Sequence, residues 1–496
     1  MKKHAIARKK LLRSSPGIFH SLLTSVLLYC ASNAQSAPAV DYIELQYEMD
    51  GNLAHVDELE VTLGRYNYQL MEPLEQLARI QMRANRFDDA EAAIEQAIQI
   101  ARFSDGLYSS TQYPLLKLEI EISRARRDWD ETLEQLDHLT WLTARKFEGD
   151  SETHLQTLNW LANTHLQCAL DTDTNHRAAH LIKATMLSET AVQMAQLTRH
   201  TDEPIYPQLL HTLSGKYYAE ARSVFGDSKV SYAIRRLFPG MDIMVSKGEA
   251  RDVRYRAGLE KLLMLRDVVA GQTNASAEAI AMAEIYVADW KLAFNRSTDI
   301  AGEYATAIAL LKEAGITPER IERFFANPVV LPRTDFTLSF EQALTTIETA
   351  TSYVLTSVAG ADGNAVASST TYQLSLLESN HELSGLVEER AGKEQLPEAT
   401  GEWTTLALSL DVDPAVQSRT NNGGYTTASY VTPSDIAIQD ETELDSGELK
   451  ATLARIKAIP FRPAMRQGTP VAATFAVNLS FRESESAGLS RLLSLR

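Results

Sequence analysis

Two copies of one short phrase organise this chain. Phe87-Asp-Asp-Ala90 begins an amphipathic run that ends near Arg102, and 42 residues later Trp129-Asp-Glu-Thr132 begins a second run that ends near Arg145. Recurrence at a fixed period is typical of stacked helical hairpins, because a single hairpin can bury only one of its faces. Such stacks present extended surfaces that bind partners. The sequence therefore predicts a binding scaffold rather than an enzyme.

The two copies also agree at their apolar positions. Ile94 corresponds to Leu136, Ala97 to Leu139, Ile100 to Leu142, Leu74 to Leu116 and Ile80 to Ile122. These positions are expected to face inward, while the exposed positions change freely. With its aromatic and acidic start, the pattern resembles the tetratricopeptide repeat, whose standard unit has about 34 residues. The resemblance implies an α-helical repeat solenoid over residues 35–328, with longer helices or loops than usual.

Other phrases resemble a group of exported proteobacterial repeat proteins of unassigned function. They are Ser104-Asp-Gly-Leu-Tyr-Ser109 with Gln112, the Trp129 phrase, Ala288-Asp-Trp290, the helix around Tyr304, and Phe325-Ala-Asn-Pro328. The aromatic residues among them are expected to pack in the core or between repeats. From about 42 to 327 the hydrophobic period is helical, with predicted helices that include 88–102, 112–125, 130–145, 152–170, 178–197, 204–238, 253–269 and 276–294.

The first 34 residues have the features of a signal peptide. The segment starts with six basic and no acidic residues, continues with a mostly apolar run from Ile18 to Ala31, and ends in Ser32-Asn33-Ala34, small residues of the kind a signal peptidase reads. We therefore expect a periplasmic or secreted protein of a Gram-negative bacterium. The alternative is an uncleaved inner-membrane anchor, although the apolar run is shorter than the roughly 20 residues of a spanning helix.

Composition limits the classes of partner. The chain has 496 residues, of which 44% are hydrophobic and 23% charged, as in ordinary soluble proteins. Loss of the signal peptide leaves 42 of the 48 basic residues against 65 acidic ones, a surface that repels nucleic acid and anionic lipid. Contact with a membrane is expected only if the amino terminus is uncleaved. Cys168 would be the one remaining cysteine, so no intramolecular disulfide is expected.

The carboxy-terminal third changes character. Residues 329–400 combine short β-branched runs with Gly- and Ser-rich stretches, which predicts a mixed connector or a partly disordered one. Residues 401–485 predict a small α+β domain in the order strand, strand, helix, strand, followed by a tail at 486–496. Its first strand is Trp403 to Val412, and Asn421-Asn-Gly-Gly424 supplies a hairpin turn into a returning strand from Tyr425 to Val431.

This end domain carries a second resemblance. Its element order, with Ile459-Pro-Phe461-Arg462-Pro463-Ala464 and then Gly468-Thr-Pro-Val471, resembles the carboxy-terminal domain of TonB, which transmits energy to outer-membrane receptors. In this phrase Phe461 is expected to seal the helix onto the sheet, and Gly468 to permit the turn into the strand. The usual Tyr-Pro phrase and the Pro-rich spacer of that family are missing, so the fold is implied without the transducing activity.

No catalytic signature is found, and neither a catalytic residue nor a cofactor is predicted. The sequence contains no glycine-rich phosphate loop, no Gly-x-Ser-x-Gly elbow and no His-Glu-x-x-His. One cluster offers nitrogen and sulfur ligands of the kind that zinc accepts, if a hairpin turn brings its members together: His165, Cys168, His176 and His180. Their spacing matches no established ligand pattern, and polar residues also gather at hairpin turns for structural reasons. No metal is therefore predicted, and these four residues stay candidates.

Three functions remain open from sequence. The first is a non-catalytic periplasmic scaffold for protein–protein interaction, whose partner belongs to a cell-envelope complex and whose end domain docks by adding a strand. The second is a TonB-like energy transducer, or an accessory of outer-membrane transport, with an uncleaved anchor. The third is a metal-dependent enzyme that uses the histidine cluster. The first is the prediction adopted; the partner's identity and the oligomeric state are beyond the sequence.

The signal segment gives a direct test. In a Gram-negative host we expect export and cleavage after Ala34, so that amino-terminal sequencing of the periplasmic protein begins at Gln35. Recovery of a chain that retains Ala31 to Ala34 in the membrane fraction would contradict cleavage and favour the anchored transducer.

Overall fold

A computed structural model describes most of the chain. The described residues are 42–109, 111–146, 151–171, 174–223, 247–333, 335–349, 352–357, 369–373, 403–414, 416–421, 424–429, 431–438, 453, 456–457 and 459–482. The predicted signal peptide (1–34), the predicted tail (486–496) and the end of the helix predicted at 204–238 lie outside them. So does most of the helix predicted within 401–485, which the sequence places at 446–457.

Helices dominate the described residues. The thirteen α-helices found there are α2 (Tyr42–Leu63), α3 (Met71–Arg83), α4 (Phe87–Asp105), α5 (Gln112–Arg126), α6 (Trp129–Lys146), α7 (Ser151–Asp171), α8 (Thr174–Leu197), α9 (Ile205–Ser223), α11 (Lys247–Gly271), α12 (Ala277–Ala293), α13 (Ile300–Glu313), α14 (Pro318–Phe324) and α15 (Phe340–Thr349). A 3₁₀ helix, η1 (Tyr68–Leu70), precedes α3. None of the described helices combines the length and the apolar character needed to cross a membrane.

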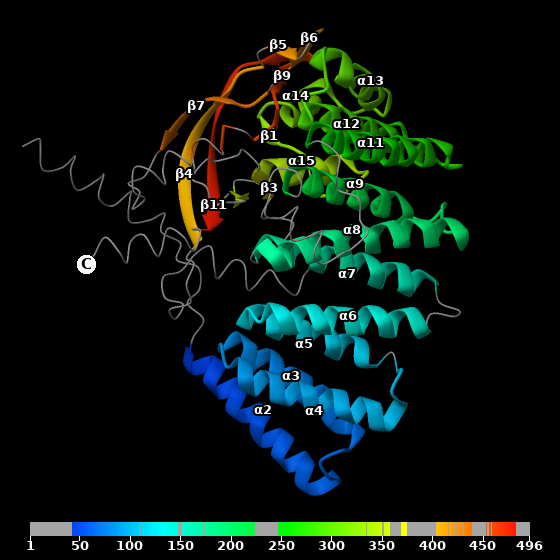
Figure 1. Cartoon of the computed structure of the whole chain (residues 1–496), viewed down its shortest axis with the longest axis vertical. Coiled ribbons are helices and arrows are strands. Elements are labelled where there is room, and N and C mark those ends of the chain that lie inside the picture. Colours follow the sequence, from blue (N-terminus) through cyan, green and yellow to red (C-terminus); the bar gives the residue numbers. More distant parts are fainter. Residues whose placement is uncertain are drawn as a thin grey trace, which may run out of the picture.

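Each helix from α2 to α13 packs against the next one along the chain, so the helices form a stack (Figure 1). Sequential packing of this kind is the arrangement of helical repeats. The coarse prediction is therefore confirmed: the chain is mostly helical, its helices are stacked like repeats, and small sheets follow at the carboxy-terminal end.

The repeated apolar positions lie in the core, as predicted. Ile94 in α4 and Leu136 in α6 are fully buried in one hydrophobic cluster. Phe87 and Trp129, the aromatic residues that start the two helices, pack against the same cluster and are partly buried. Burial of a leucine or isoleucine side chain contributes about 1.5–3 kcal/mol. Residues at equivalent positions of the 42-residue repeat are therefore buried in both copies.

The turns inside the helix pairs repeat as well. Asn85 after α3 and Arg127 after α5 both adopt the left-handed conformation, with φ of 58° and 63°. The following residue then donates its N–H to a carbonyl five residues earlier, Arg86 to Gln81 (2.8 Å) and Asp128 to Ser123 (3.0 Å). This pattern satisfies the last carbonyls of α3 and α5.

Two hydrophobic clusters meet at α7. The N-terminal cluster runs from Leu45 to Cys168, and the C-terminal cluster runs from Leu155 to Met465. Since α7 contributes side chains to both, and Leu187 in α8 packs against both, the core continues through the stack.

The strands form one larger sheet and three small pairs. The strands are β1 (Val329–Val330), β2 (Ser352–Ser357), β3 (Ser369–Gln373), β4 (Trp403–Val412), β5 (Val416–Asn421), β6 (Gly424–Ser429), β7 (Pro433–Ile438), β8 (Phe461–Arg462), β9 (Ala464–Arg466), β10 (Thr469–Val471) and β11 (Ala473–Arg482). The five-stranded sheet has the order β3-β2-β11-β4-β7, with β11 parallel to β2 and antiparallel to β4. The remaining pairs are β1 with β8, β9 with β10, and β5 with β6.

One predicted strand pairing is wrong. The turn at Asn421–Gly424 does form a hairpin, but it joins β5 to β6, whereas β4 pairs with β7 and β11. The chain leaves β4 at Val412 and passes Pro414, which has no N–H for a ladder, before β5 begins. The hairpin turn therefore closes a separate ribbon. Because β2 and β3 share the sheet of β4 and β11, the predicted ranges 329–400 and 401–485 contribute to one sheet.

Residues 459–471 return to the helices. Met465 N–H donates to Phe325 O (2.7 Å) and Leu331 N–H to Pro460 O (3.0 Å), so this segment is bonded to the chain around β1. Phe461 is buried in the C-terminal cluster, and Gly468 takes a left-handed φ of 77° in the turn before β10, as the sequence predicted. The sheets and the helical stack thus share one core.

A substitution at Gly258 in α11 tests how α11 packs on α12. Gly258→Ala is expected to lower the free energy of unfolding by about 1–3 kcal/mol, because the added methyl overlaps the Trp290 ring. That ring is fixed, since its Nε1–H donates to Tyr255 O (3.0 Å). Gly215→Ala in α9 is the control: its new Cβ meets no atom within 4 Å, and alanine should raise stability by up to about 1 kcal/mol. Equal denaturation midpoints for the two variants would contradict this packing.

Candidate binding surface

The four candidate metal ligands do not converge in the structure. His165 and His180 face each other, with 2.9 Å between their Nδ1 atoms, and both rings are fully buried. His176 instead pairs with Asp130 (2.8 Å), and the Cys168 thiol lies in the N-terminal hydrophobic cluster. Within the described ranges, no group of three or more His, Cys, Asp or Glu side chains could hold a metal ion.

The histidine pair has the character of a packing element. Burial, with smaller contributions from His180 and Lys183, holds the pKa of His165 well below its usual value. A neutral ring can donate to the other ring, whereas two charged rings could not share this hydrogen bond. The pair therefore joins α7 to α8 by one buried polar contact.

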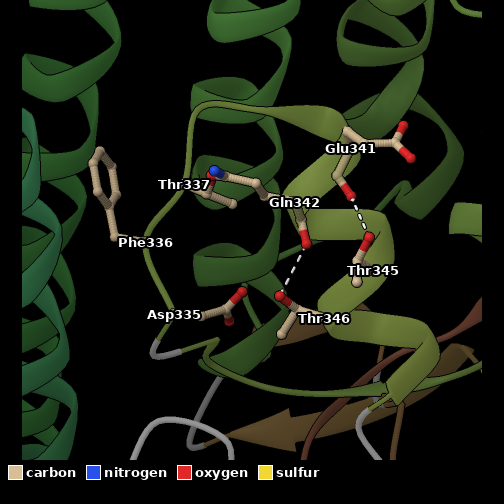
Figure 2. Close-up of a pocket in the computed structure, with 7 residues that line it drawn as sticks. All are labelled: Asp335, Phe336, Thr337, Glu341, Gln342, Thr345 and Thr346. Atoms are coloured by element: carbon tan, nitrogen blue, oxygen red, sulfur yellow. Dashed lines mark hydrogen bonds between the residues drawn. The ribbon is translucent and has the colours of Figure 1, made fainter. Parts of the chain in front are cut away.

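One pocket of about 420 Å³ lies between the segment before α15 and α15 itself (Figure 2). It is lined by Asp335, Phe336, Thr337, Glu341, Gln342, Thr345 and Thr346. Asp335 is paired with Arg333, and the hydroxyls of Thr345 and Thr346 donate to the carbonyls of Glu341 (3.0 Å) and Gln342 (2.9 Å). Many polar groups of the lining are therefore already bonded to other groups of the chain. The lining residues do not form a pair of nucleophile and general base.

A buried charge pair joins the carboxy-terminal segment to the helices. Arg462 is fully buried, with one terminal nitrogen 3.7 Å from the Asp289 carboxylate and the guanidinium 4.6 Å from the Phe324 ring centre. Tyr304 donates to the other Asp289 oxygen (2.5 Å). Burial raises the pKa of Asp289, while Arg462 and the Tyr304 hydrogen bond oppose this shift. The arrangement is a structural joint between α12, α13 and β8.

Exposed aromatic residues collect instead at one edge of the helical stack. We call this set, together with the exposed Leu107 between them, the aromatic stripe: Tyr66, Phe103, Leu107, Tyr108 and Trp141. It occupies the loop after α2, the end of α4, the loop after α4 and the last turns of α6. In Figure 1 the loop between α4 and α5 lies at the right-hand edge of the stack, whereas the five-stranded sheet lies at the left. Phe103 is 74% exposed and Trp141 47%, although both belong to helices with buried inner faces.

The aromatic stripe is made of two ring pairs from successive repeats. Tyr66 lies 5.5 Å from Phe103, and Tyr108 lies 5.8 Å from Trp141, in tilted geometries that aromatic rings favour. The guanidinium of Arg145 lies 4.5 Å from the Trp141 ring centre and 5.9 Å from that of Tyr108. Each loop aromatic thus rests on a residue from the end of a later helix.

The two loops that carry Tyr66 and Tyr108 have the same internal hydrogen bonds. Gly64 and Gly106 both have positive φ (89° and 91°) and both donate to the carbonyl four residues earlier. Asn67 and Ser109, also 42 residues apart, occupy equivalent positions in them. Asn67 Oδ1 accepts from the N–H of Gln69 (3.0 Å) and Ser109 Oγ from that of Thr111 (3.2 Å).

Glutamine side chains complete these loops. The buried Gln112 amide donates to the carbonyls of Gly106 and Leu107 (both 3.1 Å) and accepts from Arg102 Nε (3.1 Å). Gln96 donates in the same way to Arg65 O (3.3 Å). With their polar groups bonded within the chain, the loops hold Tyr66, Leu107 and Tyr108 in place while leaving them exposed.

The sequence reasoning did not find this surface. It assigned the aromatic residues of the recurring phrases to packing, and Trp290, Tyr304 and Phe325 are indeed buried. Tyr108 packs between repeats on Trp141 but keeps 46% of its surface exposed. The sequence does contain a sign of this surface: Tyr66 and Tyr108 are 42 residues apart, the same interval that separates the repeated core positions.

Comparison with known proteins adds one distant likeness. No family model matches the chain, and no curated protein matches it. Among solved structures, the chain is similar to BtubC (BKLC) from P. vanneervenii, with 15% sequence identity and a TM-score of 0.31, over 59% of this chain and 96% of that chain. This is a resemblance of one helical protein to another and assigns no function.

The burial of His211, which lies behind the pocket, can be tested through the pH dependence of the free energy of unfolding. Its ring lies 4.5 Å from Tyr286, and burial lowers its pKa to about 4. Below its usual pKa of about 6.5 the unfolded chain binds a proton that the folded chain does not, so this histidine destabilises the fold as pH falls. Relative to His211→Phe, the free energy of unfolding of the unmodified protein should drop by up to about 3 kcal/mol between pH 6.5 and 4. A difference that is constant over this range, measured by denaturant unfolding, would contradict the buried neutral ring.

Proposed function

We propose that the chain is an exported, non-catalytic scaffold that binds a protein partner through the amino-terminal half of its helical stack. The aromatic stripe is the observation that carries this proposal. Tyrosine and tryptophan are enriched at the energetic centres of protein interfaces, where they contribute large contact area at low entropic cost. Exposed aromatic clusters on soluble proteins otherwise favour aggregation, so their retention in two successive repeats indicates use.

The loop framework supports the same function. Binding costs free energy when flexible loops must be ordered, and a surface that is already held in place avoids most of this cost. The loop segments 64–70 and 106–109 are held by hydrogen bonds of glutamine, asparagine and serine side chains. The surface is thus rigid before a partner arrives.

The carboxy-terminal unit contributes a second docking element to this proposal. Among the described strands, β7 pairs only with β4 and so ends the sheet. Its Ile436 and Ile438 pack against the C-terminal cluster, while Ser434 and Asp435 are exposed. An edge of this kind can accept a strand from a partner. The likeness of residues 401–485 to the TonB carboxy-terminal domain, the signal peptide at 1–34 and a periplasmic location belong to the same proposal.

Site-specific cross-linking in cells tests the scaffold function. A photo-reactive phenylalanine analogue placed at Tyr108 or at Trp141 is expected to capture a protein partner, because both side chains are half exposed at the stripe. The matched control is the same analogue at Val253 in α11, which is exposed to a similar extent (47%) but lies outside the stripe. Absence of any protein adduct at the two stripe positions, or equal adducts at Val253, would count against the proposed function.

A further inference from the structure

We infer that the aromatic stripe binds an acidic segment of a partner protein, which carries two apolar anchor residues. This inference rests on the proposed scaffold function and names the chemistry of its partner. Each anchor would contact one of the two ring pairs, and carboxylates beside the anchors would contact the cations that flank them.

Two arginines flank the aromatic stripe. Arg65 precedes Tyr66 in the first loop, and Arg145 lies on Trp141 at the end of α6; both side chains are exposed. Among the described residues, no carboxylate lies within ion-pair distance of either one. Several other basic residues in the same part of the stack are paired with carboxylates: Arg79 with Glu75, Arg83 with Glu48, Arg86 with Asp89, Arg126 with Glu91 and Lys183 with Asp137.

This contrast points to an acidic partner. In a chain of net charge −17, two cations that have no ion-pair partner among the described residues leave charge at an apolar surface that a partner can complement. The carboxylate nearest to Arg65 in the sequence, Glu60, accepts from Gln96 (2.6 Å), and Asp105, beside the second loop, accepts from Thr111 (2.7 Å). Glu148, the nearest to Arg145 in the sequence, lies outside the described residues. At physiological salt, screening acts over about 8 Å, so the local arginines outweigh the distant acidic surface.

The Trp141 geometry favours a carboxylate over a sugar. A sugar would stack on an open aromatic face, but the guanidinium of Arg145 already lies over the Trp141 ring, 4.5 Å from its centre. The Arg145 side chain is also exposed, and a guanidinium can bind a carboxylate through two hydrogen bonds. The ring therefore orients the cation, and the cation selects an acidic group.

The two ring pairs are neighbours in the stack. Phe103 of the first pair and Tyr108 of the second are five residues apart in the chain, and helix α3 contacts α5 as well as α4. One segment of a partner can therefore contact both pairs.

A displayed library of random twelve-residue peptides, selected against the full chain purified from the periplasm, tests this inference. We expect the enriched peptides to carry two apolar residues with Asp or Glu beside them. Binding of the selected peptides should fall about tenfold or more in Trp141→Ala and in Tyr66→Ala. Met186→Ala in α8, at another exposed side chain (52%), should leave it unchanged.

Charge reversal provides the sharper test and changes only an exposed side chain. Selection against Arg145→Glu is expected to yield peptides with Lys or Arg in place of the acidic residues. Peptides without acidic enrichment, or unchanged affinity in Arg145→Glu, would overturn the inference. So would self-association of the chain that Trp141→Ala abolishes, because the occupant would then be a second copy. If stripe cross-links form in cells while the peptides lack acidic residues, this inference fails and the scaffold function stands.

Discussion

The burial of each helix face against the next helix is the constraint on which the rest of the structure depends. A single pair such as α3 and α4 leaves the outer face of Ile94 and its neighbours without cover, and the stack supplies that cover by adding α5 and α6. A stack must also end. At its carboxy-terminal end, residues 459–471 contact α12 through β8 and α13 through β10, and Phe461 joins the same core.

The same periodicity produces the candidate binding surface. When a helix pair recurs every 42 residues, its loops recur at the same edge, and any side chain at an equivalent loop position forms part of a row. Tyr66 and Tyr108 are such a row. Carbonyl groups of these loops accept hydrogen bonds from Gln96 and Gln112, which hold the backbone beside the tyrosines in place. The hydrophobic core and the candidate binding surface therefore follow from the same repeat.

Much of the fold could be predicted because it is local and periodic. The buried positions of Ile94 and Leu136, the limits of α4 to α8 and the strand Trp403–Val412 all follow from spacing along the chain. The candidate site was less accessible. Spacing brought His165 and Cys168 onto neighbouring turns, but the sequence does not show that His176 turns toward Asp130. Nor does it show which aromatic residues the next repeat leaves uncovered, since Trp290 and Trp141 look alike in isolation.

The sequence by itself determined the period of the repeat, the helices and the inward faces, because helix formation and amphipathicity depend on neighbours three and four residues away. Only the tertiary structure decided that β4 lies between β7 and β11, that Asn478 pairs with Ser352, and that the aromatic stripe stays open. These features join residues that are distant in the chain. Their free energy depends on which surfaces meet in space, and no local pattern specifies that meeting.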